Sequence, residues 1–386
     1  MREPSDEAPT PALRPFRLSL YAALAYTLLI AYASLTPFAG WQAPGRPMLE
    51  FVLASWPRYV TRGDVLINMA AYLPFGFLVI VSLPRRWPKS VAVAVTCLLG
   101  AGLSFFMEFG QQFVPGRIAS NLDLLTNGAG ALLGAALAVP LLRRPATLST
   151  LTGVRDYWFH TGRAADAGLV LLALFFFAQA NPSLPWMASR VLEAAVPLEP
   201  APVQGFSFTQ LGLSMTNALA LSMLISLLTP RPRPRFWLCT LALVAIALGK
   251  LLAAHLLLKP EAVLQWLSVE AGLGTAYGLA FAGLVLRLGR APRVWVGMAG
   301  AAASLVFAYA FEHAATPSAV LRLFDWRYGH LLNFNGITCF VAELWPVLAL
   351  GYFALAGHSL RNRLSGPGAR RAEGSAAAGL PRVPRR

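Results

Sequence analysis

The chain has 386 residues, of which 56% are apolar and 13% are charged, and its formal net charge is +15 at pH 7. Charged residues make up about 25% of an average soluble domain, so this composition argues against a soluble protein. The apolar residues form blocks that approach or exceed the roughly 18 residues of a bilayer-spanning helix, whereas a transmembrane barrel would show alternating segments of about ten. We therefore predict an all-α, polytopic helical membrane protein.

Ten membrane-spanning helices are predicted from the apolar blocks. Pro182 and Pro185 interrupt the fifth of them, and the apolar stretch 47–60 is too short to cross and is predicted to lie at the membrane interface. The predicted spans are residues 18–36, 65–83, 90–111, 122–142, 167–186, 211–229, 236–258, 262–287, 294–312 and 337–356. An even number of spans places both termini on the same side.

Basic residues are distributed unevenly between the two sides. The two tails and the loops on their side hold 23 of the 32 Lys and Arg residues, whereas the alternate loops hold 8. Because positive charge marks the cytoplasmic side, both termini are predicted to be cytoplasmic. These residues would face anionic lipid headgroups in the bilayer. The basic tail 359–386 is rich in Gly, Pro and Ala and lacks interleaved aromatic residues, so we expect a disordered segment and no nucleic-acid binding.

The first predicted span raises the question of cleavage. The sequence AYA at 31–33 follows an apolar run and is a candidate signal-peptidase site. The region before that run is long and contains acids, which favours an uncleaved helix.

A polar segment, MEFGQQFVPGRIASNLDLLTNGAG at 107–130, joins the third and fourth spans. Glu108 and Gln111 lie three residues apart, and Asp123 and Asn127 lie four apart, so each pair shares one helix face. The intervening VPGR sequence is typical of a tight turn. We therefore expect the two polar faces to meet, with Arg117 beside them.

A related pattern opens the second span. DVLIN at 64–68 places Asp64 and Asn68 at the start of a helix, as DLLTN does at 123–127. Two interpretations stay open for the aspartates. They act as helix caps, which the helix dipole favours, or they form one site at the outer face together with the neighbouring polar residues.

Four blocks resemble the VanZ-like family over about residues 18–142. They are SLTPF (34–38), DVLINMAAYLPFGFL (64–78), MEFGQQFVPGR (107–117) and DLLTNGAGALLG (123–134). The family is named for a membrane protein that raises resistance to teicoplanin and is associated with the bacterial cell envelope. The resemblance implies a multi-pass protein of the bacterial cytoplasmic membrane, without implying a reaction.

The candidate site residues fall into two groups. The candidates for ligand binding are Asp64, Asn68, Glu108, Gln111, Arg117, Asp123 and Asn127. Pro74, Gly76, Gly128, Gly130 and Gly134 are candidates for structural roles. Pro74 is expected to bend the second span, and the spacing of Gly130 and Gly134 is typical of helices that pack closely in lipid.

The predicted organisation has five parts. They are an N-terminal tail (1–17), a VanZ-like domain of four helices (18–142), a cytoplasmic loop (143–166), a second transmembrane region of about six helices (167–358) and a basic tail (359–386).

Three functions are considered. The first is binding, or helping to modify, a lipid-linked or cell-wall precursor at the outer face, with an effect on glycopeptide tolerance. The second is a proton-coupled transporter that uses Glu270 and Glu343, which lie inside predicted spans and therefore need partners. The third is an integral-membrane enzyme of envelope polysaccharide synthesis, for which no nucleophile–base set is recognisable. The three cysteines have no zinc-site spacing, so neither a metal nor another cofactor is expected.

Overall fold

The structure is a computed structural model of the chain. It describes residues 17–36, 38, 40–45, 47–56, 62–115, 117–143, 145–191, 206–230, 233–311, 320, 323–324 and 329–364. Within these ranges the regular elements are helices, apart from one isolated bridge between Leu258 and Phe324. Eight of the described helices are long and apolar enough to cross a bilayer. This confirms the predicted all-α, polytopic membrane class.

The chain divides into two compact units. The first contains Met1–Tyr157 and Thr161–Val170, and the second contains Trp158–His160 and Leu171–Arg386.

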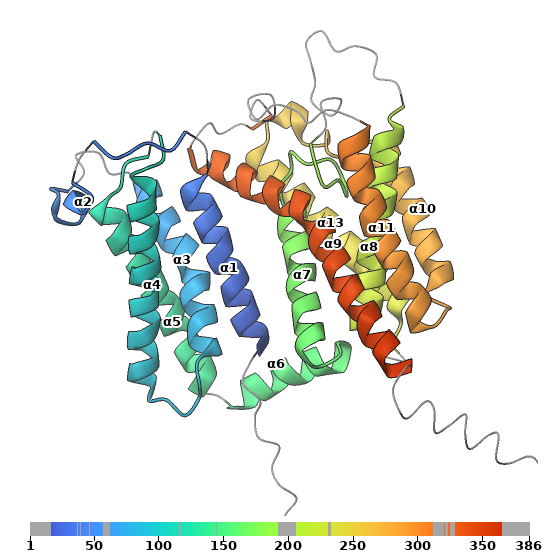
Figure 1. Ribbon diagram of the computed structural model, residues 1–386, viewed down its shortest axis with the longest axis horizontal. Coiled ribbons are helices and arrows are strands. Elements are labelled where there is room, and N and C mark those ends of the chain that lie inside the picture. Colours follow the sequence, from blue (N-terminus) through green and yellow to red (C-terminus); the bar gives the residue numbers. More distant parts are fainter. Residues whose placement is uncertain are drawn as a thin grey trace, which may run out of the picture. The chain divides into compact units, whose positions relative to one another are not determined.

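Four long helices form the first unit, and they run alternately up and down (Figure 1). They are α1 (Arg17–Leu35), α3 (Arg62–Ser82), α4 (Lys89–Gln111) and α5 (Asn121–Arg143). Their bounds agree with the first four predicted spans to within about three residues, because charged and turn-forming residues delimit the apolar blocks. A short helix, α2 (Glu50–Leu53), lies in the stretch predicted to be interfacial. Pro74 lies inside α3, as the sequence predicts.

The backbones of α3 and α5 touch through glycines. A methyl group added at Gly130 would lie 2.3 Å from the Met69 carbonyl oxygen, and one added at Gly134 would lie 2.0 Å from that of Leu73. A methyl group added at Gly76 of α3 would lie 2.0 Å from the Ala131 oxygen, whereas one added at Gly128 would have no atom within 4 Å. Backbones come this close only at glycines. In lipid the hydrophobic effect does not drive helices together, so close packing of this kind stabilises the helix pair.

The second unit is built around one central helix, α8 (Phe208–Leu228), nearly all of whose residues are buried. Its neighbours are α9 (Arg235–Leu257), α10 (Val269–Val285), α11 (Arg290–Ala310) and α13 (Gly329–Leu364) (Figure 1). The second half of α7 (Arg163–Gln179) joins α13, because Trp345 Nε1 donates to the Leu171 oxygen at 2.9 Å. Glycines again permit close packing: a methyl at Gly274 would lie 2.2 Å from the Leu211 oxygen of α8.

Two helices differ in their bounds from the spans that the sequence predicts for them. Helix α7 ends at Gln179 instead of 186, before the two prolines. Helix α10 begins at Val269 instead of 262, because Pro260 starts a 3₁₀ turn and Ser268 caps the helix by accepting from Ala271 N. Glu270 therefore lies in the first turn of α10, and the prediction that it lies several residues inside a span was wrong. Each of these helices has 17 residues, fewer than the eight longer ones.

One helix was missed by the sequence analysis. The predicted loop 143–166 contains α6 (Pro145–Trp158), which starts at a proline. Proline suits the first turn of a helix because the backbone N–H it lacks has no intrahelical partner there. Arg155 of α6 forms an ion pair with Asp166 in the first turn of α7.

Candidate functional site

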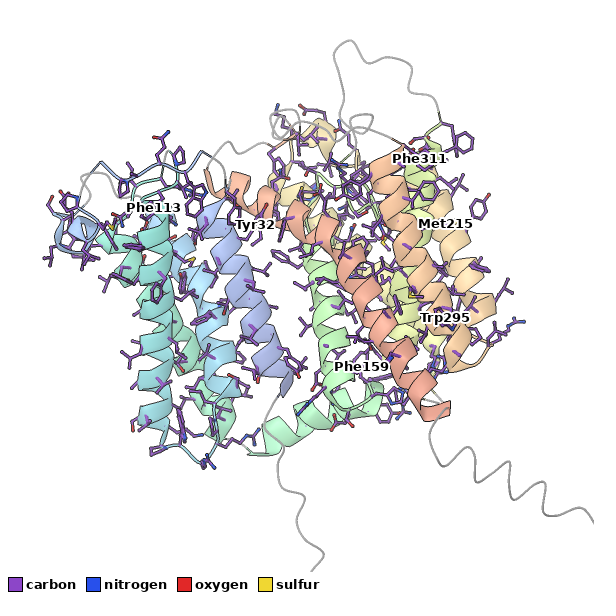
Figure 2. All side chains as sticks on the ribbon, viewed as in Figure 1. Tyr32, Phe113, Phe159, Met215, Trp295 and Phe311 are labelled. Carbon is purple, nitrogen blue, oxygen red and sulfur yellow. The ribbon has the colours of Figure 1, made fainter. Side chains whose placement is uncertain are left out.

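The predicted site residues gather at one end of the first unit. At this end α1 and α4 finish and α3 and α5 begin (Figure 1). Tyr32 of α1 and Phe113, just after α4, mark the same end in Figure 2. The antiparallel order of the helices thus brings together motifs that are more than fifty residues apart in the chain.

The two related motifs are in direct contact. Asn68 Nδ2 of α3 donates a hydrogen bond of 2.7 Å to Asp123 Oδ1 of α5. This contact shows that DVLIN and DLLTN lie side by side, as the interpretation of a common site requires. The Asp64 side chain lies outside the part of the chain that the structure describes, and its backbone belongs to the first turn of α3, one turn before Asn68.

Helix capping and the contact between motifs are separate features. Ser120 lies just before α5, and its Oγ accepts a hydrogen bond from Leu122 N at 3.2 Å. Asp123 is the third residue of α5, and its carboxylate accepts from a neighbouring helix. A cap needs only the backbone of its own helix, so capping alone does not account for Asp123.

Glu108 is the most deeply buried acid of the site. It is 2% exposed near the end of α4, and its Oε2 accepts a hydrogen bond of 2.9 Å from Ser120 N. Gln111, one turn later, is half-buried at the last position of α4. In the following turn, Arg117 Nη2 donates to the Ala33 carbonyl oxygen of α1 at 3.4 Å. The turn therefore bridges α4, α5 and α1.

A second layer lies deeper in the helix bundle. Asn127 Nδ2 donates to Ser104 Oγ at 2.9 Å, and both side chains are buried. The Asn127 Oδ1 atom and the hydroxyl of buried Tyr72 have no hydrogen-bond partner among the described residues. Tyr72 lies near Ser104 and Glu108. Its neighbour Tyr26 of α1 differs, because the Tyr26 hydroxyl donates to the Ala71 oxygen at 2.9 Å.

The sequence analysis missed Ser104 and Tyr72, although a signal was present. Each lies one helical turn inward from a predicted residue: Ser104 from Glu108, and Tyr72 from Asn68. Residues four apart share a helix face, so extending each polar face by one turn finds both of them. The site is thus a column of polar groups that leads from the turn at Arg117 into the bundle.

This column offers donors and acceptors for a polar ligand. Among the side chains that the structure describes, it contains two carboxyl groups, three amides, two hydroxyl groups and a guanidinium, which belong to Glu108, Asp123, Asn68, Gln111, Asn127, Tyr72, Ser104 and Arg117. Among the described residues, no group of three His, Cys, Asp or Glu side chains is arranged as metal ligands would be. The arrangement suits recognition through several hydrogen bonds.

The fold and site define a polytopic helical membrane protein with a polar column at one end of a four-helix unit. The comparisons add a family. Residues 16–143 match the family model described as VanZ/LLP1, which confirms the resemblance seen in the four sequence blocks. These residues form a VanZ-type domain that coincides with α1 to α5. No curated protein and no solved structure matches the chain.

Proposed function

We propose that the VanZ-type domain binds the headgroup of a lipid-linked cell-wall precursor at the outer face of the bacterial cytoplasmic membrane. The observation that supports it most is the buried pair of unpartnered polar atoms, Asn127 Oδ1 and the Tyr72 hydroxyl, behind the buried carboxylate of Glu108.

Burial of these groups is costly unless something satisfies them. An unpaired polar group buried in an apolar environment costs about 1–3 kcal/mol. The amide oxygen of Asn127 accepts, the hydroxyl of Tyr72 donates and accepts, and the carboxyl group of Glu108 accepts when ionised and also donates when protonated. Sugar hydroxyl and acetamido groups present complementary donors and acceptors. A sugar-bearing headgroup would therefore satisfy the column better than an apolar ligand.

Arg117 supplies the second recognition element. Its guanidinium lies at the turn between α4 and α5, at the mouth of the column. A planar guanidinium suits bidentate contact with phosphate. A lipid-linked precursor carries a phosphate next to its sugar, so a single ligand would satisfy both elements.

The outer location follows from the charge distribution. The predicted cytoplasmic side holds 23 of the 32 Lys and Arg residues, and this supports an outer position for the turn between α4 and α5. On this basis both termini are proposed to be cytoplasmic. Binding of a precursor there would alter the supply or the accessibility of the target of glycopeptide antibiotics, and antibiotic tolerance is the expected phenotype.

The transporter alternative has less support. It relies on acids inside the membrane, but Glu270 lies in the first turn of α10. Glu343 has a counter-ion, because its Oε1 lies 3.5 Å from Arg190 Nε. The enzyme alternative has paired acids in Glu108 and Asp123, without a recognisable nucleophile and base.

A binding experiment on the full chain tests the proposal. The protein in phosphatidylcholine nanodiscs is titrated with a polyprenyl diphosphate N-acetylhexosamine, and complexes are counted by native mass spectrometry. We expect Arg117→Lys, which keeps the charge and loses the planar fork, to weaken binding about tenfold. Tyr72→Phe should weaken it by a similar factor, because it removes only the hydroxyl.

The matched control is Ile118→Ala, next to Arg117 in the same turn, where the side chain is exposed. This variant should bind as the wild type does. If Arg117→Lys and Tyr72→Phe bind the probe as tightly as Ile118→Ala does, the polar column is not its binding site and the proposal is wrong.

A further inference from the structure

The second unit contains an irregular segment buried among its helices. Residues 181–191, which follow α7, have no regular secondary structure, yet all of them are buried except half-buried Arg190 (Figure 1). Most loops run over the surface, where water satisfies their backbone groups. In membrane proteins, non-helical backbone at depth is tolerated only where protein buries it or where it lines a site.

Side chains from several helices hold this segment in place. Gln179 Nε2 donates to the Ala188 oxygen at 2.9 Å, and Asn217 Nδ2 of α8 donates to the Met187 oxygen at 2.9 Å. Ser214 Oγ donates to the Trp186 oxygen at 2.8 Å. Met187 itself has a φ of 56°, in the left-handed region that a residue with a side chain rarely adopts. Such strain persists only where surrounding contacts enforce it, and it concentrates at functional sites.

A fully buried cation lies against this segment. Lys250 of α9 is 0% exposed, and its Nζ donates to the carbonyl oxygens of Gln179 at 3.1 Å and Asn181 at 2.6 Å. An ammonium has three donors, so one donor is left over from these two bonds. No carboxylate in the described ranges lies within ion-pair distance of Lys250. A buried charge normally has a counter-charge.

Two further polar atoms beside the segment lack partners. Trp266 Nε1 and Gln210 Oε1 are buried and have no hydrogen bond within the described part of the chain. Lys250 Nζ lies over the Trp266 ring, 5.9 Å from its centroid, so the two donors belong to one cluster. Gln210 joins the same cluster, because its Nε2 donates to the Trp186 oxygen at 3.3 Å.

We propose that Lys250, Trp266 and Gln210 form a second binding site, here called the loop site, which holds an oxyanion of carboxylate or phosphate type. The anion accepts from Lys250 Nζ and Trp266 Nε1. Gln210 Oε1 accepts from a donor elsewhere on the ligand. The buried segment 181–191 forms the wall that positions these groups.

Thermal unfolding of the full chain in nanodiscs tests the loop site. Three probes are titrated: acetate, inorganic phosphate and phosphatidylglycerol mixed into phosphatidylcholine. We expect at least one probe to raise Tm. A response to acetate or phosphate identifies a soluble ligand, and a response to phosphatidylglycerol alone identifies a lipid headgroup. The apparent Kd for that probe should rise at least tenfold in Trp266→Phe, which keeps the ring and loses only the N–H donor.

A matched control is Trp186→Phe. Its indole N–H is already satisfied, because it donates to Thr275 Oγ1 at 2.9 Å. This variant should lower the Tm and leave the anion response unchanged, whereas Trp266→Phe should leave the Tm without probe unchanged. Lys250→Met should abolish the response, and Trp266→Phe keeps the test valid if Lys250→Met does not fold.

Two results would overturn the loop site. The first is that no probe raises Tm. An equal rise of Tm in wild type and Trp266→Phe would also overturn the loop site, because it would assign the effect to surface cations. The second concerns Asp325, which lies outside the described residues. If Asp325→Asn and Lys250→Met lower the Tm equally and non-additively, the counter-ion is part of the chain and no ligand is needed. None of these variants touches the VanZ-type domain, so failure here is distinct from failure of the proposed function.

Discussion

The two units use polar side chains in different ways. In the first unit, polar groups on regular helices bond to each other or to a neighbouring turn, as in the pairs Asn68–Asp123 and Asn127–Ser104. In the second unit, several of them bond to the backbone of the segment 181–191. Helices satisfy their own backbones, whereas an irregular segment in lipid requires side chains to do so. The first set is therefore available for a ligand, and most of the second set supports the fold.

Both units nevertheless pack by the same means. Their closest helix pairs, α3 with α5 and α8 with α10, meet through glycines whose added methyl group would collide with a carbonyl oxygen. The difference between the units therefore concerns the polar groups, and substitutions of matched residues can test it.

The largest contrast is expected for two buried asparagines. Asn217→Leu removes the donor to the Met187 oxygen and the acceptor of the Ser304 hydroxyl, so it should lower the free energy of unfolding by about 2–3 kcal/mol. Asn127→Leu deprives only Ser104 of a partner and should cost about 1 kcal/mol, because a helical serine can bond to its own backbone. Urea unfolding in detergent measures both. Equal losses would remove the proposed distinction between the two units.

The glycine contacts should give a smaller effect that is the same in both units. Gly134→Ala places a methyl 2.0 Å from a carbonyl oxygen, and the strain should cost about 1–3 kcal/mol and lower membrane abundance. Gly274→Ala should behave alike. The controls are Gly128→Ala and Gly272→Ala on the same helices, where the added methyl meets nothing within 4 Å. If controls and test variants are equally abundant, close helix contact does not limit stability.

A pair of tyrosines sharpens the comparison within the first unit. Tyr26→Phe removes a hydrogen bond to the Ala71 oxygen and should cost about 1 kcal/mol. Tyr72→Phe removes a hydroxyl without a partner in the described chain, so it should leave stability unchanged or raise it. Thermal unfolding without added ligand distinguishes the two. A loss in Tyr72→Phe as large as in Tyr26→Phe would indicate that the Tyr72 hydroxyl has a structural role.

Much of the helical map was predictable, because charges and prolines delimit the apolar blocks. The alternating direction of the helices also placed DVLIN and DLLTN at the same end, although it left open whether Asn68 and Asp123 are in contact. The start of α10 did not, since apolar residues such as Val263 and Trp266 precede the helix and resemble the beginning of a span. Apolar composition reports burial, and it does not report whether the backbone is helical.

The loop site was not predictable from the sequence for a similar reason. Residues 181–185, NPSLP, have the composition of an ordinary surface turn. The burial of the whole segment 181–191 depends on amides and hydroxyls contributed by α8, α11 and α13, which are separated from it by up to about 150 residues. Lys250 was visible as a charge inside a span, but its carbonyl partners were not. Such tertiary contacts have no local signature.

The smallest expected effect is a pH dependence near neutrality that comes from one histidine of the second unit. His160, between α6 and α7, has a lowered pKa because of partial burial and, after that, because of the guanidinium groups of Arg290, Arg235 and Arg293. The neutral imidazole is therefore favoured in the folded protein. Below about pH 6.5, the unfolded chain binds a proton more readily than the folded chain does. The contribution of His160 to the free energy of unfolding is therefore fully present above this pH and is lost as the pH falls.

The matched variant for this effect is His160→Gln, which removes the titrating ring and keeps the hydrogen bond from the His160 backbone N to the Leu228 oxygen. The Tm of the wild type and of the variant is measured from pH 5 to pH 8. As the pH falls, the Tm of the wild type should decrease relative to that of the variant. Since the side chain is exposed, the shift should be small. High salt should weaken the part that comes from the arginines more than the part that comes from burial. A difference in Tm that does not change with pH would show that His160 titrates alike in the folded and unfolded chain, and the basic cluster around it would then have no electrostatic effect on stability.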